Sequence, residues 1–399
     1  MNTASTKRKI PERLGGPGLS EAERLRYARQ IIVPGIGLDG QAKLKGAGAL
    51  IVGAGGLGSP AALYLAAAGI GRLGIADPDI VEASNLQRQI LHFTSDIGKA
   101  KVESARGKLA DINPFLRIDI FGEPLKAANA LRIVKDYDVV IDGSDNFPAR
   151  YVINDACVLL KKPMVYGSVQ HFIGQLSVFD GRKGPCYRCL MPSPPAPGSV
   201  LGCAETGVLG VVPGVIGSLQ AVEVIKIILG LGTPLVGRLL FYDSLAASFD
   251  LIDVSKNPAC PACGAKPSIS APVDYEELCG DDWPGYRPGG VSDRIARSGS
   301  ISVSELKRRL EGGDRFFFLE IHEPGAVGEF LAADVLRIPK SEIMKRISEI
   351  PRDREVIVLC RVGIQGRELI REMQDLGFDN LINLEGGTIA WKYDIDIVP

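Results

Sequence analysis

Apolar segments alternate with amphipathic ones along most of the chain. Four short apolar runs predict β-strands: 49–52, 72–76, 117–121 and 138–141. Three amphipathic stretches predict helices: 59–68, 99–112 and 147–160. Ser20 and Glu23, three residues apart, form a capping pair that predicts a further helix over 20–30. Apolar strands that alternate with helices predict a mostly parallel, Rossmann-like α/β sheet covered on both faces.

The pattern continues toward the C-terminus and divides the chain. A proline-rich loop is expected over 192–198, a long helix over 215–229 and a strand over 238–242. A second alternation has expected strands at 316–321, 356–359 and 381–384 and a helix over 366–376. We therefore expect four parts: a disordered tail over 1–19, an α/β domain over 20–268, a linker over 269–295 and a small α/β domain over 296–399.

Composition and charge disfavour several functional classes. The 399 residues carry 46 Lys and Arg against 47 Asp and Glu, so no surface for nucleic acid or an anionic membrane is indicated. The most apolar stretch, 208–230, is interrupted by Pro213, Glu223 and Lys226, and no membrane-spanning helix is expected. No apolar block follows the basic residues at 7–9, which argues against a signal peptide. Eight cysteines are too few for a disulfide scaffold and fit a reducing cytoplasm.

A glycine-rich motif follows the first of these strands. It reads Gly53-Ala54-Gly55-Gly56-Leu57-Gly58 and fits GxGxxG, in which the backbone approaches a phosphate at a helix N-terminus. Asp77, at the end of the next strand, stands where a ribose hydroxyl acceptor belongs. Taken alone, these residues favour a dinucleotide over a mononucleotide by roughly two to one, and indicate an NAD-dependent dehydrogenase.

Further polar groups follow that a hydride-transferring enzyme does not need. Ser84-Asn85-Leu86-Gln87-Arg88-Gln89 and Lys101 supply amide and cationic groups, and Asp142-Gly143-Ser144-Asp145-Asn146 follows a buried strand. An adenylating enzyme must hold ATP and Mg2+ while a carboxylate attacks the α-phosphate; Arg and Lys can clamp the phosphates and Asp can bind the metal. A lone Lys or Arg is usually a solvated surface charge, but joint placement beside one phosphate loop disfavours that interpretation.

These motifs resemble the MoeB/ThiF family. Together with Arg26-Tyr27-Ala28-Arg29-Gln30-Ile31, the resemblance covers roughly residues 20–268. Its members are bacterial relatives of ubiquitin-activating enzymes and adenylate the C-terminal glycine of ubiquitin-like sulfur carrier proteins.

The resemblance implies roles for individual residues. Gly56 and Asp77 are expected at the nucleotide, with Asp77 on the ribose. Three side chains are expected at the phosphates, Asn85, Arg88 and Lys101, and Asp145 is expected at Mg2+. Arg29 is expected to reach the ATP of a second subunit, which implies a homodimer. The complete expected nucleotide site consists of Arg29, Gly53, Gly55, Gly56, Gly58, Asp77, Ser84, Asn85, Leu86, Gln87, Arg88, Lys101, Asp145 and Asn146.

Four of the cysteines form two CxxC pairs, Cys186 with Cys189 and Cys260 with Cys263. Four thiolates in two such pairs fit a closed tetrahedral Zn2+ site, which has no open position for catalysis. Two unrelated reduced pairs or a redox motif are the alternative, at about one in ten. The family resemblance also implies structural zinc.

Cys203 follows the proline-rich loop, in Gly202-Cys203-Ala204-Glu205-Thr206. A thiol on a mobile loop can reach a bound acyl-adenylate. Sequence position alone weighs this evenly against a small residue near a helix start. The family resemblance implies the first role, because the family places in this segment a mobile cysteine that forms an acyl linkage with the carrier.

Cys360 follows the strand expected at 356–359 and begins the loop Cys360-Arg361-Val362-Gly363-Ile364-Gln365-Gly366-Arg367. Backbone N–H groups and the helix dipole stabilise a thiolate at such a position, and Arg361 and Arg367 add positive charge. The site can hold a persulfide whose outer sulfur is transferred; a buried strand-end cysteine is the alternative. With Glu385-Gly386-Gly387-Thr388-Ile389-Ala390-Trp391, residues 296–399 resemble a rhodanese sulfurtransferase domain.

The rhodanese resemblance departs from the family at one place. Rhodanese domains usually carry an Asp-x-Arg pair after the first core strand, and this chain has Glu320-Ile321-His322. The family's arginine helps to organise the domain, so turnover by this domain is left open. Cys157 is expected in the core, and no role is assigned to His92, His171 or Cys279.

Together, these features predict an ATP-dependent adenylyltransferase and sulfurtransferase acting on a small ubiquitin-like sulfur carrier that ends in Gly-Gly. Cys203 handles the activated acyl group in this hypothesis. Cys360, loaded by a cysteine desulfurase or by thiosulfate, delivers the sulfur that gives a thiocarboxylate and AMP. Three alternatives remain: an adenylyltransferase with a degenerate rhodanese domain used for docking, an NAD-dependent oxidoreductase, and a non-catalytic scaffold.

Overall fold

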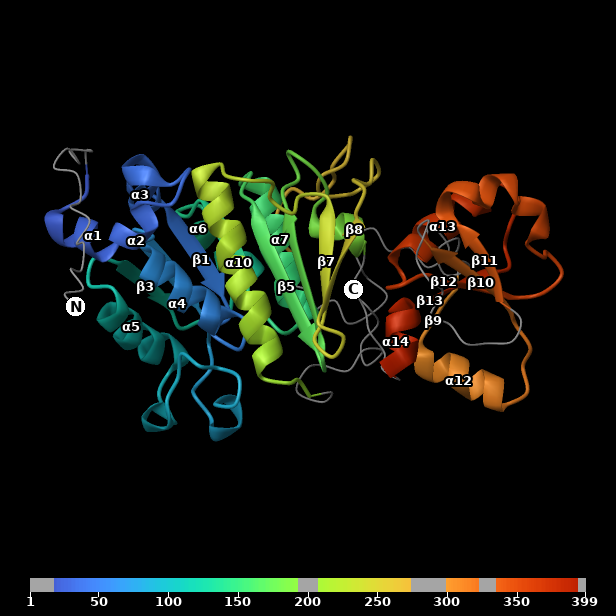
Figure 1. Cartoon of the computed structure of the whole chain (residues 1–399), viewed down its shortest axis with the longest axis horizontal. Coiled ribbons are helices and arrows are strands. Elements are labelled where there is room, and N and C mark those ends of the chain that lie inside the picture. The colour runs from blue at the N-terminus through green and yellow to red at the C-terminus, as the bar shows by residue number, and fades with distance from the viewer. Residues whose placement is uncertain (1–17, 193–206, 274–298, 323–334, 394–399) are drawn as a thin grey trace, which may run out of the picture. The chain divides into compact units, whose positions relative to one another are not determined.

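The computed structural model describes residues 18–192, 207–273, 299–322 and 335–393 (Figure 1). These residues form two compact units: an N-terminal unit of 18–192 with 207–273, and a C-terminal unit of 299–322 with 335–393. Each unit is built on one sheet. Cys203, Cys279, the expected tail up to residue 17 and most of the expected linker lie outside the described residues.

The sheet of the N-terminal unit has eight strands in the order β3-β2-β1-β4-β5-β6-β7-β8. Their bounds are β1 (Gly48–Val52), β2 (Arg72–Ala76), β3 (Arg117–Phe121), β4 (Val139–Asp142), β5 (Met164–Gln170), β6 (Ile173–Phe179), β7 (Arg238–Asp243) and β8 (Ser248–Asp253). Neighbours from β3 to β5 are parallel, and neighbours from β5 to β8 are antiparallel. The predicted Rossmann-like parallel sheet is confirmed for the half that carries the glycine loop. Strands β5, β6 and β8 have no counterpart among the predicted elements.

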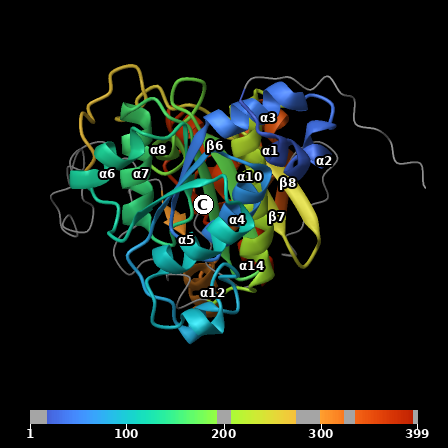
Figure 2. The same cartoon turned by 90° about the vertical axis from the view of Figure 1, so that its left-hand side faces the viewer.

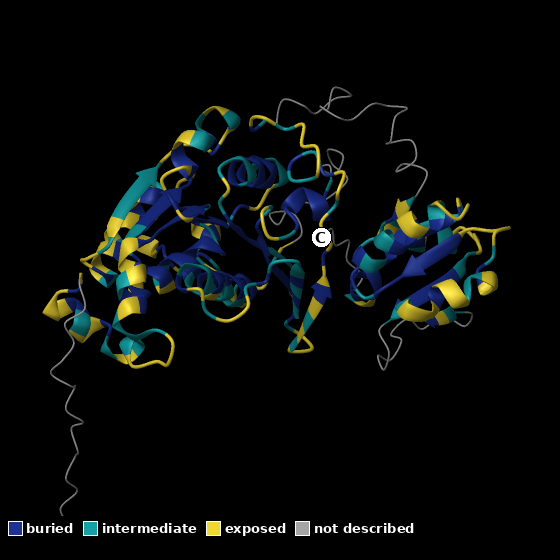
Figure 3. Cartoon of the chain, turned by 90° about the horizontal axis from the view of Figure 1, so that it is seen from above, coloured by how far each residue is buried: buried dark blue, intermediate teal, exposed yellow. Residues whose placement is uncertain are grey.

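Helices cover both faces of this sheet, as Figure 2 shows for α4 and α10 on one side and α6 and α7 on the other. The helices of this unit are α1 (Glu21–Arg26), α2 (Ala28–Ile31), α3 (Gly37–Gly46), α4 (Gly58–Ala68), α5 (Lys101–Ile112), α6 (Ala127–Val134), α7 (Phe147–Leu159), α8 (Tyr187–Leu190), α10 (Val211–Leu229) and the 3-10 turns η1 (Ala83–Asn85) and η2 (Thr94–Asp96). The core between the layers consists of fully buried aliphatic side chains, among them Ile51, Leu65, Leu73, Ile141 and Val224. In Figure 3 the central strands are buried, whereas outward helix surfaces are exposed.

Two predicted helices of this unit have different bounds. The helix expected over 20–30 is interrupted at Tyr27, although Ser20 and Glu23 form the predicted capping box at its start. The helix expected from 215 begins at Val211. Pro213 lies in its first turn, where the missing backbone N–H has no intrahelical partner to lose. Proline is therefore compatible with this position.

Helix α10 is long and apolar enough to cross a membrane by length and composition. Its contacts indicate a different setting, because it packs against α4 and against strands β4, β5 and β6. Glu223 on this helix is buried, and its carboxylate accepts hydrogen bonds from Lys226 Nζ and from the backbone N–H of Leu235. We therefore interpret α10 as a core helix of the N-terminal unit.

The sheet of the C-terminal unit has five parallel strands in the order β11-β10-β12-β13-β9. Its elements are β9 (Ser300–Ile301), α12 (Val303–Glu311), β10 (Phe317–His322), β11 (Val335–Pro339), η3 (Lys340–Lys345), η4 (Ile347–Glu349), β12 (Val356–Leu359), α13 (Ile364–Gln374), β13 (Leu381–Leu384) and α14 (Gly387–Tyr393). A separate apolar core includes Leu319, Val358, Leu369 and Met373. The predicted small α/β domain is confirmed in its three expected strands and its helix.

Candidate functional site

The loops that follow β1, β2 and β4 meet at the carboxyl edge of the N-terminal sheet. The strand order reverses direction between β1 and β4, which is where open α/β sheets bind their ligands. Gly53, with φ of +96°, passes so close to the β4 loop that a Cβ there would lie 2.5 Å from the carbonyl oxygen of Gly143. The glycine at position 53 is therefore needed both for backbone conformation and for contact between the two loops.

Asp77 holds the glycine loop from the adjacent strand. One carboxylate oxygen accepts the backbone N–H of Ala54 at 2.7 Å, and the other accepts that of Asp79 at 2.9 Å. Burial raises the pKa of the Asp77 carboxyl above its ordinary value, while attraction to Lys101 and the two N–H donors oppose this. Each oxygen retains a second lone pair, so the carboxylate can still accept a ribose hydroxyl.

The expected phosphate-binding side chains lie on the chain that follows the strand of Asp77, and one of them reaches the glycine loop. Lys101 is buried at the start of α5, and its ammonium lies 2.8 Å from the Asp79 carboxylate. Arg88 donates to the carbonyl oxygen of Ser84 at 3.2 Å, and its Cγ would lie 3.5 Å from a Cβ placed on Gly56. Asn85 is buried, and its side-chain oxygen accepts the backbone N–H of Glu82 at 3.1 Å. The structure thus brings Arg88 directly to the glycine loop and ties Lys101 to the strand end that carries Asp77.

The β4 loop presents an exposed carboxylate above a buried one. Asp145 and Asn146 are exposed, and Asn146 caps α7 by accepting the backbone N–H of Ala149 at 2.9 Å. Below them, the fully buried Asp142 accepts two hydrogen bonds from Ser144, at 3.0 Å from N–H and 2.5 Å from the hydroxyl. The two carboxylates therefore have different settings: Asp142 orders the loop, and Asp145 is exposed to solvent.

The start of α10 also contacts the nucleotide loops. A Cβ on Gly210 would overlap the backbone oxygen of Gln87, and a Cβ on Gly56 would lie 3.2 Å from the ring of Pro213. The described chain resumes just before this point, at Gly207, whose carbonyl oxygen accepts the backbone N–H of His171 at 3.1 Å. Gly210 and Pro213 are therefore packed against the loops of the candidate ATP site.

Arg29 lies on α2 and is exposed. Within the described residues its side chain makes no hydrogen bond or ion pair with the other expected nucleotide residues. The remaining expected residues lie in two segments already described. The glycine loop holds Gly55 and Gly58, and the segment 84–89 holds Ser84, Leu86 and Gln87.

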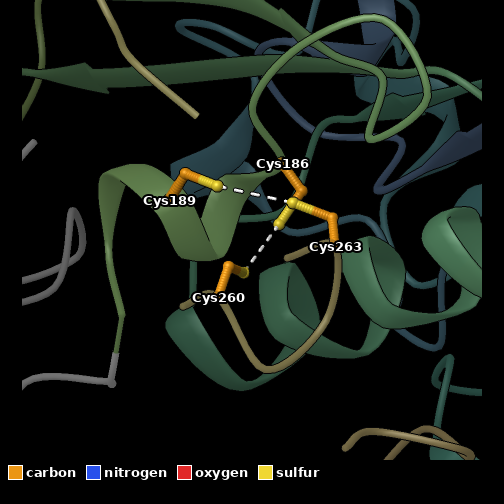
Figure 4. Close-up of side chains that lie close together, drawn as sticks. All are labelled: Cys186, Cys189, Cys260 and Cys263. Atoms are coloured by element: carbon orange, nitrogen blue, oxygen red, sulfur yellow. Dashed lines mark hydrogen bonds between the residues drawn. The ribbon is translucent and has the colours of Figure 1, made fainter. Parts of the chain in front are cut away.

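The two CxxC pairs form one cluster (Figure 4). The four Sγ atoms all lie within 4.8 Å of one another, with 3.6 Å between Cys186 and Cys260 and 3.4 Å between Cys189 and Cys263. Tetrahedral zinc with Zn–S bonds of about 2.3 Å separates its sulfurs by about 3.8 Å, so the donor set and spacing fit Zn2+. The prediction that these cysteines come together is confirmed.

A buried ion pair fixes the first half of the cysteine cluster. Arg188, between Cys186 and Cys189, donates two hydrogen bonds to Asp155 on α7, at 2.8 and 2.9 Å. The backbone N–H of Tyr187 donates to Asn154 on the same helix at 2.8 Å. The short helix α8 is thereby attached to α7 independently of any metal.

Cys360 lies in a cradle of backbone amides in the C-terminal unit. Its Sγ accepts the N–H of Gly363 at 3.1 Å and that of Gly366 at 3.3 Å. The thiol is only 1% exposed, and burial raises the pKa of Cys360 above its ordinary value although the amides lower it. The expected amide donors to the Cys360 sulfur are present. Their effect on its pKa is smaller than the opposite effect of burial.

The residues at the rhodanese departure lie on β10, next to the strand that precedes Cys360. Glu320 is buried opposite Leu359, and its carboxylate pairs with Arg337 on β11. His322 ends β10 opposite Pro339, and within the described residues its Nδ1 is buried without a hydrogen-bond partner. Glu320 is therefore paired with Arg337 on β11, in a chain that has His322 where rhodanese domains usually carry an arginine.

Two residues of the N-terminal site have no counterpart in the sequence-based prediction. Arg150 lies under the β4 loop, where its Nε is 3.7 Å from Asp142 and its Nη2 donates to Ser168 at 3.1 Å. His92 is buried and contacts the glycine loop through the carbonyl oxygen of Ala54. Neither residue stands at a spacing typical of a known site, and only the fold brings them there.

Comparisons with known proteins agree with these two sites. The ThiF family matches residues 27–262, and the rhodanese-like domain matches residues 303–394. The probable adenylyltransferase/sulfurtransferase MoeZ of Mycobacterium tuberculosis is 40% identical over 383 residues, which cover 94% of each chain. The sulfur carrier protein adenylyltransferase of Thermus thermophilus is 52% identical over 260 residues, which cover 64% of this chain and 96% of the relative.

The fold agrees as well. The crystal structure of E. coli MccB with MccA-N7isoASN has a TM-score of 0.51 at 25% identity, over 56% of this chain and 69% of that chain. The family match and the full-length relative favour nucleotidyl transfer over the NAD-dependent oxidoreductase. The chain belongs to the ThiF family, carries a C-terminal rhodanese-like domain, and is an adenylyltransferase and sulfurtransferase.

Proposed function

We propose that the N-terminal unit uses ATP and Mg2+ to adenylate the C-terminal glycine of a small ubiquitin-like sulfur carrier ending in Gly-Gly, and that Cys360 supplies sulfur. The relative from T. thermophilus, named a sulfur carrier protein adenylyltransferase, supports this substrate class. One observation carries the proposal: a glycine loop, Asp77 and Lys101 meet at one sheet edge in a chain that also holds Cys360 in an amide cradle.

In the first step, a carboxylate oxygen of the carrier's terminal glycine attacks the α-phosphorus of ATP, and pyrophosphate leaves. Backbone N–H groups at the start of α4 stabilise the phosphates, and the cationic Arg88 and Lys101 offset the charge that develops on them. Asp77 binds the ribose. Asp145 is the proposed ligand of Mg2+, which neutralises phosphate charge when bound.

In the second step, the outer sulfur of a Cys360 persulfide attacks the acyl carbon, and AMP leaves. The product is an acyl disulfide on Cys360. A second thiol then attacks the Cys360 sulfur, which releases the carrier thiocarboxylate and leaves a disulfide that a cellular thiol reductant reopens. A cysteine desulfurase or thiosulfate restores the persulfide.

Cys203 is our candidate for this second thiol, which handles the activated acyl group by releasing it from Cys360 as the thiocarboxylate. It precedes Gly207 by four residues, and four extended residues span at most about 14 Å. Gly210 and Pro213, a few residues further on, contact the nucleotide loops. This chain geometry supports a Cys203 within reach of the adenylate.

We also propose a cytoplasmic homodimer in which Arg29 completes the ATP site of the second subunit. The exposed side chain of Arg29, which has no hydrogen bond or ion pair with the nucleotide residues among the described part of its own chain, supports this arrangement. Eight cysteines without a disulfide pattern support a reducing compartment.

Pyrophosphate exchange and the intact mass of candidate Gly-Gly carriers test the proposal. Wild-type protein is expected to show exchange and, with a sulfur donor, a sulfur-for-oxygen mass shift. Cys360→Ala should retain exchange and lose the shift, and Cys203→Ala should retain exchange and slow thiocarboxylate release. Cys279→Ala is the matched control and should behave like wild type. Absence of exchange with every carrier would overturn the adenylation half.

A second candidate function is adenylation with a rhodanese-like domain that only docks partners. The observation that favours it is His322, at the position where the family carries arginine. Exchange without any mass shift, in wild-type protein supplied with thiosulfate or with a desulfurase and cysteine, would support this alternative. A shift that depends on Cys360 rejects it.

A further inference from the structure

His92 is a buried histidine to which the adenylation chemistry gives no role. It lies between η1 and η2 and is 3% exposed. Its Nε2 lies 3.0 Å from the carbonyl oxygen of Ala54 in the glycine loop, and its Nδ1 lies 2.9 Å from the hydroxyl of Ser104 on α5. The ring thus bridges the glycine loop and a core helix.

The partners of the ring define where its proton lies. A carbonyl oxygen can only accept, so Nε2 must carry the proton that it donates to Ala54. Nδ1 of the neutral ring is then the acceptor, and the Ser104 hydroxyl donates to it. The ammonium of Lys108 donates to the same hydroxyl oxygen at 3.1 Å. The hydroxyl hydrogen is shared between this ring nitrogen and the Asp96 carboxylate, which also hydrogen-bonds to Ser104.

The electrostatic surroundings also favour the neutral ring. Burial lowers the pKa of His92 below its ordinary value, although the Ala54 carbonyl oxygen opposes this shift. Lys101 and Lys108 lower it further, and the nearby Asp96 opposes them.

His92 and Asp77 fix two consecutive peptide groups of the loop. Asp77 accepts the N–H of Ala54, which belongs to the peptide between Gly53 and Ala54. His92 donates to the carbonyl oxygen of Ala54, which belongs to the next peptide, between Ala54 and Gly55. The hydroxyl of Ser59 adds a longer contact to the same oxygen, at 3.4 Å. Both backbone torsions of Ala54 are thereby restrained.

The second of these peptides links His92 to the nucleotide. A trans peptide is planar, and its N–H points opposite to its C=O. A carbonyl of Ala54 held toward His92 therefore turns the N–H of Gly55 away from the ring. Among the described residues this N–H has no protein acceptor, so it is a donor that a phosphate can use.

We propose that His92 is a positioning residue that sets the direction of the Gly55 N–H toward the ATP phosphates. The inference rests on the proposed function, because it takes ATP as the occupant of the glycine loop. It assigns to His92 an effect on nucleotide affinity without contact between the ring and the nucleotide.

Equilibrium binding of ATP in the absence of any carrier tests this role. His92→Ala is expected to raise the Kd for ATP about tenfold, the loss of one hydrogen bond to a charged group. The same variant should leave the Kd for adenosine nearly unchanged, because adenosine has no phosphate. His92→Gln, whose side-chain N–H can reach the Ala54 carbonyl, should stay within about threefold of wild type for ATP.

Leu91→Ala is the matched control. Leu91 is equally buried and adjacent, but it belongs to the apolar core and its side chain has no polar hydrogen to donate to the Ala54 carbonyl. This variant should lower the melting temperature while leaving the ratio of ATP to adenosine affinity unchanged. If Leu91→Ala changes that ratio as His92→Ala does, the effect is one of packing and the inference is wrong.

A spectroscopic measurement keeps the test decisive if His92→Ala does not fold. The chain has three histidines, so long-range 1H–15N spectra can be assigned by substitution of each. We expect the Nε2–H tautomer of His92 in wild type, and a mixture of tautomers with weaker ATP binding in Ser104→Ala. Wild type that binds ATP with a His92 in the Nδ1–H tautomer overturns the inference. Wild type that does not bind ATP at all overturns the proposed function instead.

Discussion

The guanidinium of Arg337 lies 2.9 Å from the carboxylate of Glu320, on a neighbouring strand whose register places the two residues opposite each other. Glu320 is buried and lies beside Leu359, which immediately precedes Cys360. Arg337 on β11 thus provides the positive charge that pairs with Glu320. The end of β10 can therefore be ordered without a positive charge on His322.

Arg337→Met should therefore weaken the C-terminal unit, because a buried carboxylate loses a charged partner. The expected loss is about 1 kcal/mol of unfolding free energy, since Arg337 is partly exposed to solvent. We expect the variant to show faster hydrogen–deuterium exchange of the β10 amides and slower sulfur transfer from Cys360. The Glu320→Gln/Arg337→Met double variant should recover much of the loss; a double variant no better than Arg337→Met would show that the pair is not coupled.

Burial of Cys360 predicts a pH dependence of stability. Because the folded-state pKa is raised above that of the unfolded chain, about 8.5, the contribution of this thiol is complete below that pH and declines as the pH rises toward the folded pKa. Relative to Cys360→Ala, wild-type protein should lose stability between pH 8 and 10 on chemical denaturation. A constant difference across this range would contradict the raised pKa.

Replacement of one cysteine of the cluster should remove zinc and destabilise the N-terminal unit. We expect about one Zn2+ per chain by elemental analysis, and none in Cys260→Ser. Loss of several kcal/mol of metal binding should lower the melting temperature by roughly 10 °C. Cys157→Ala, which changes a buried cysteine outside the cluster, is the control and should retain zinc.

Asp77→Asn should weaken nucleotide binding through the ribose and the glycine loop together. The amide offers one acceptor where the carboxylate accepts two backbone N–H groups, so we expect the Kd for adenosine to rise about tenfold or more. Because burial raises the pKa of Asp77, wild-type affinity should fall with decreasing pH before an ordinary aspartate would be protonated. Calorimetric titration of adenosine between pH 4 and 7 measures both effects, and Asp77→Asn should lack the pH dependence.

The proposed dimer predicts complementation between two inactive variants. Arg29→Ala and Asp145→Ala should each reduce pyrophosphate exchange strongly as homodimers. In a mixed dimer, one ATP site receives an intact Arg29 from one chain and an intact Asp145 from the other, so part of the activity should return. Mixing that restores nothing would place Arg29 in the site of its own chain or outside any site.

Much of the parallel sheet could be predicted because its strands are continuous apolar runs. Strand β6 could not, since it interrupts its apolar residues with Gly174, Gln175 and Ser177 although every position is buried. These polar side chains find partners only in the folded sheet: Ser177 donates to the carbonyl oxygen of Arg238, and Gln175 accepts from Tyr166. The local pattern of apolar and polar residues does not show such distant partners.

The candidate sites show the same division. The glycine loop and the CxxC pairs were accessible because their chemistry depends on local spacing. The bridge from His92 to Ala54 spans 38 residues, and the pair of Glu320 and Arg337 depends on strand register. In the sequence His92, Glu320 and Arg337 stand in no recognisable motif. Only the tertiary structure shows which partner each of them has.

The cysteine cluster joins two places that are 74 residues apart in the chain. The described elements between them, which include α10 and β7, thus lie between two chain segments that meet at one cluster. A peptide bond cut between Cys189 and Cys260 would leave two fragments that each contribute two sulfurs to the same zinc ion. Such a nicked protein should migrate as one species on a native gel, because zinc and the packing of α10 and β7 against the other strands both hold the fragments together. A chelator should lower its melting temperature more than that of the uncut chain.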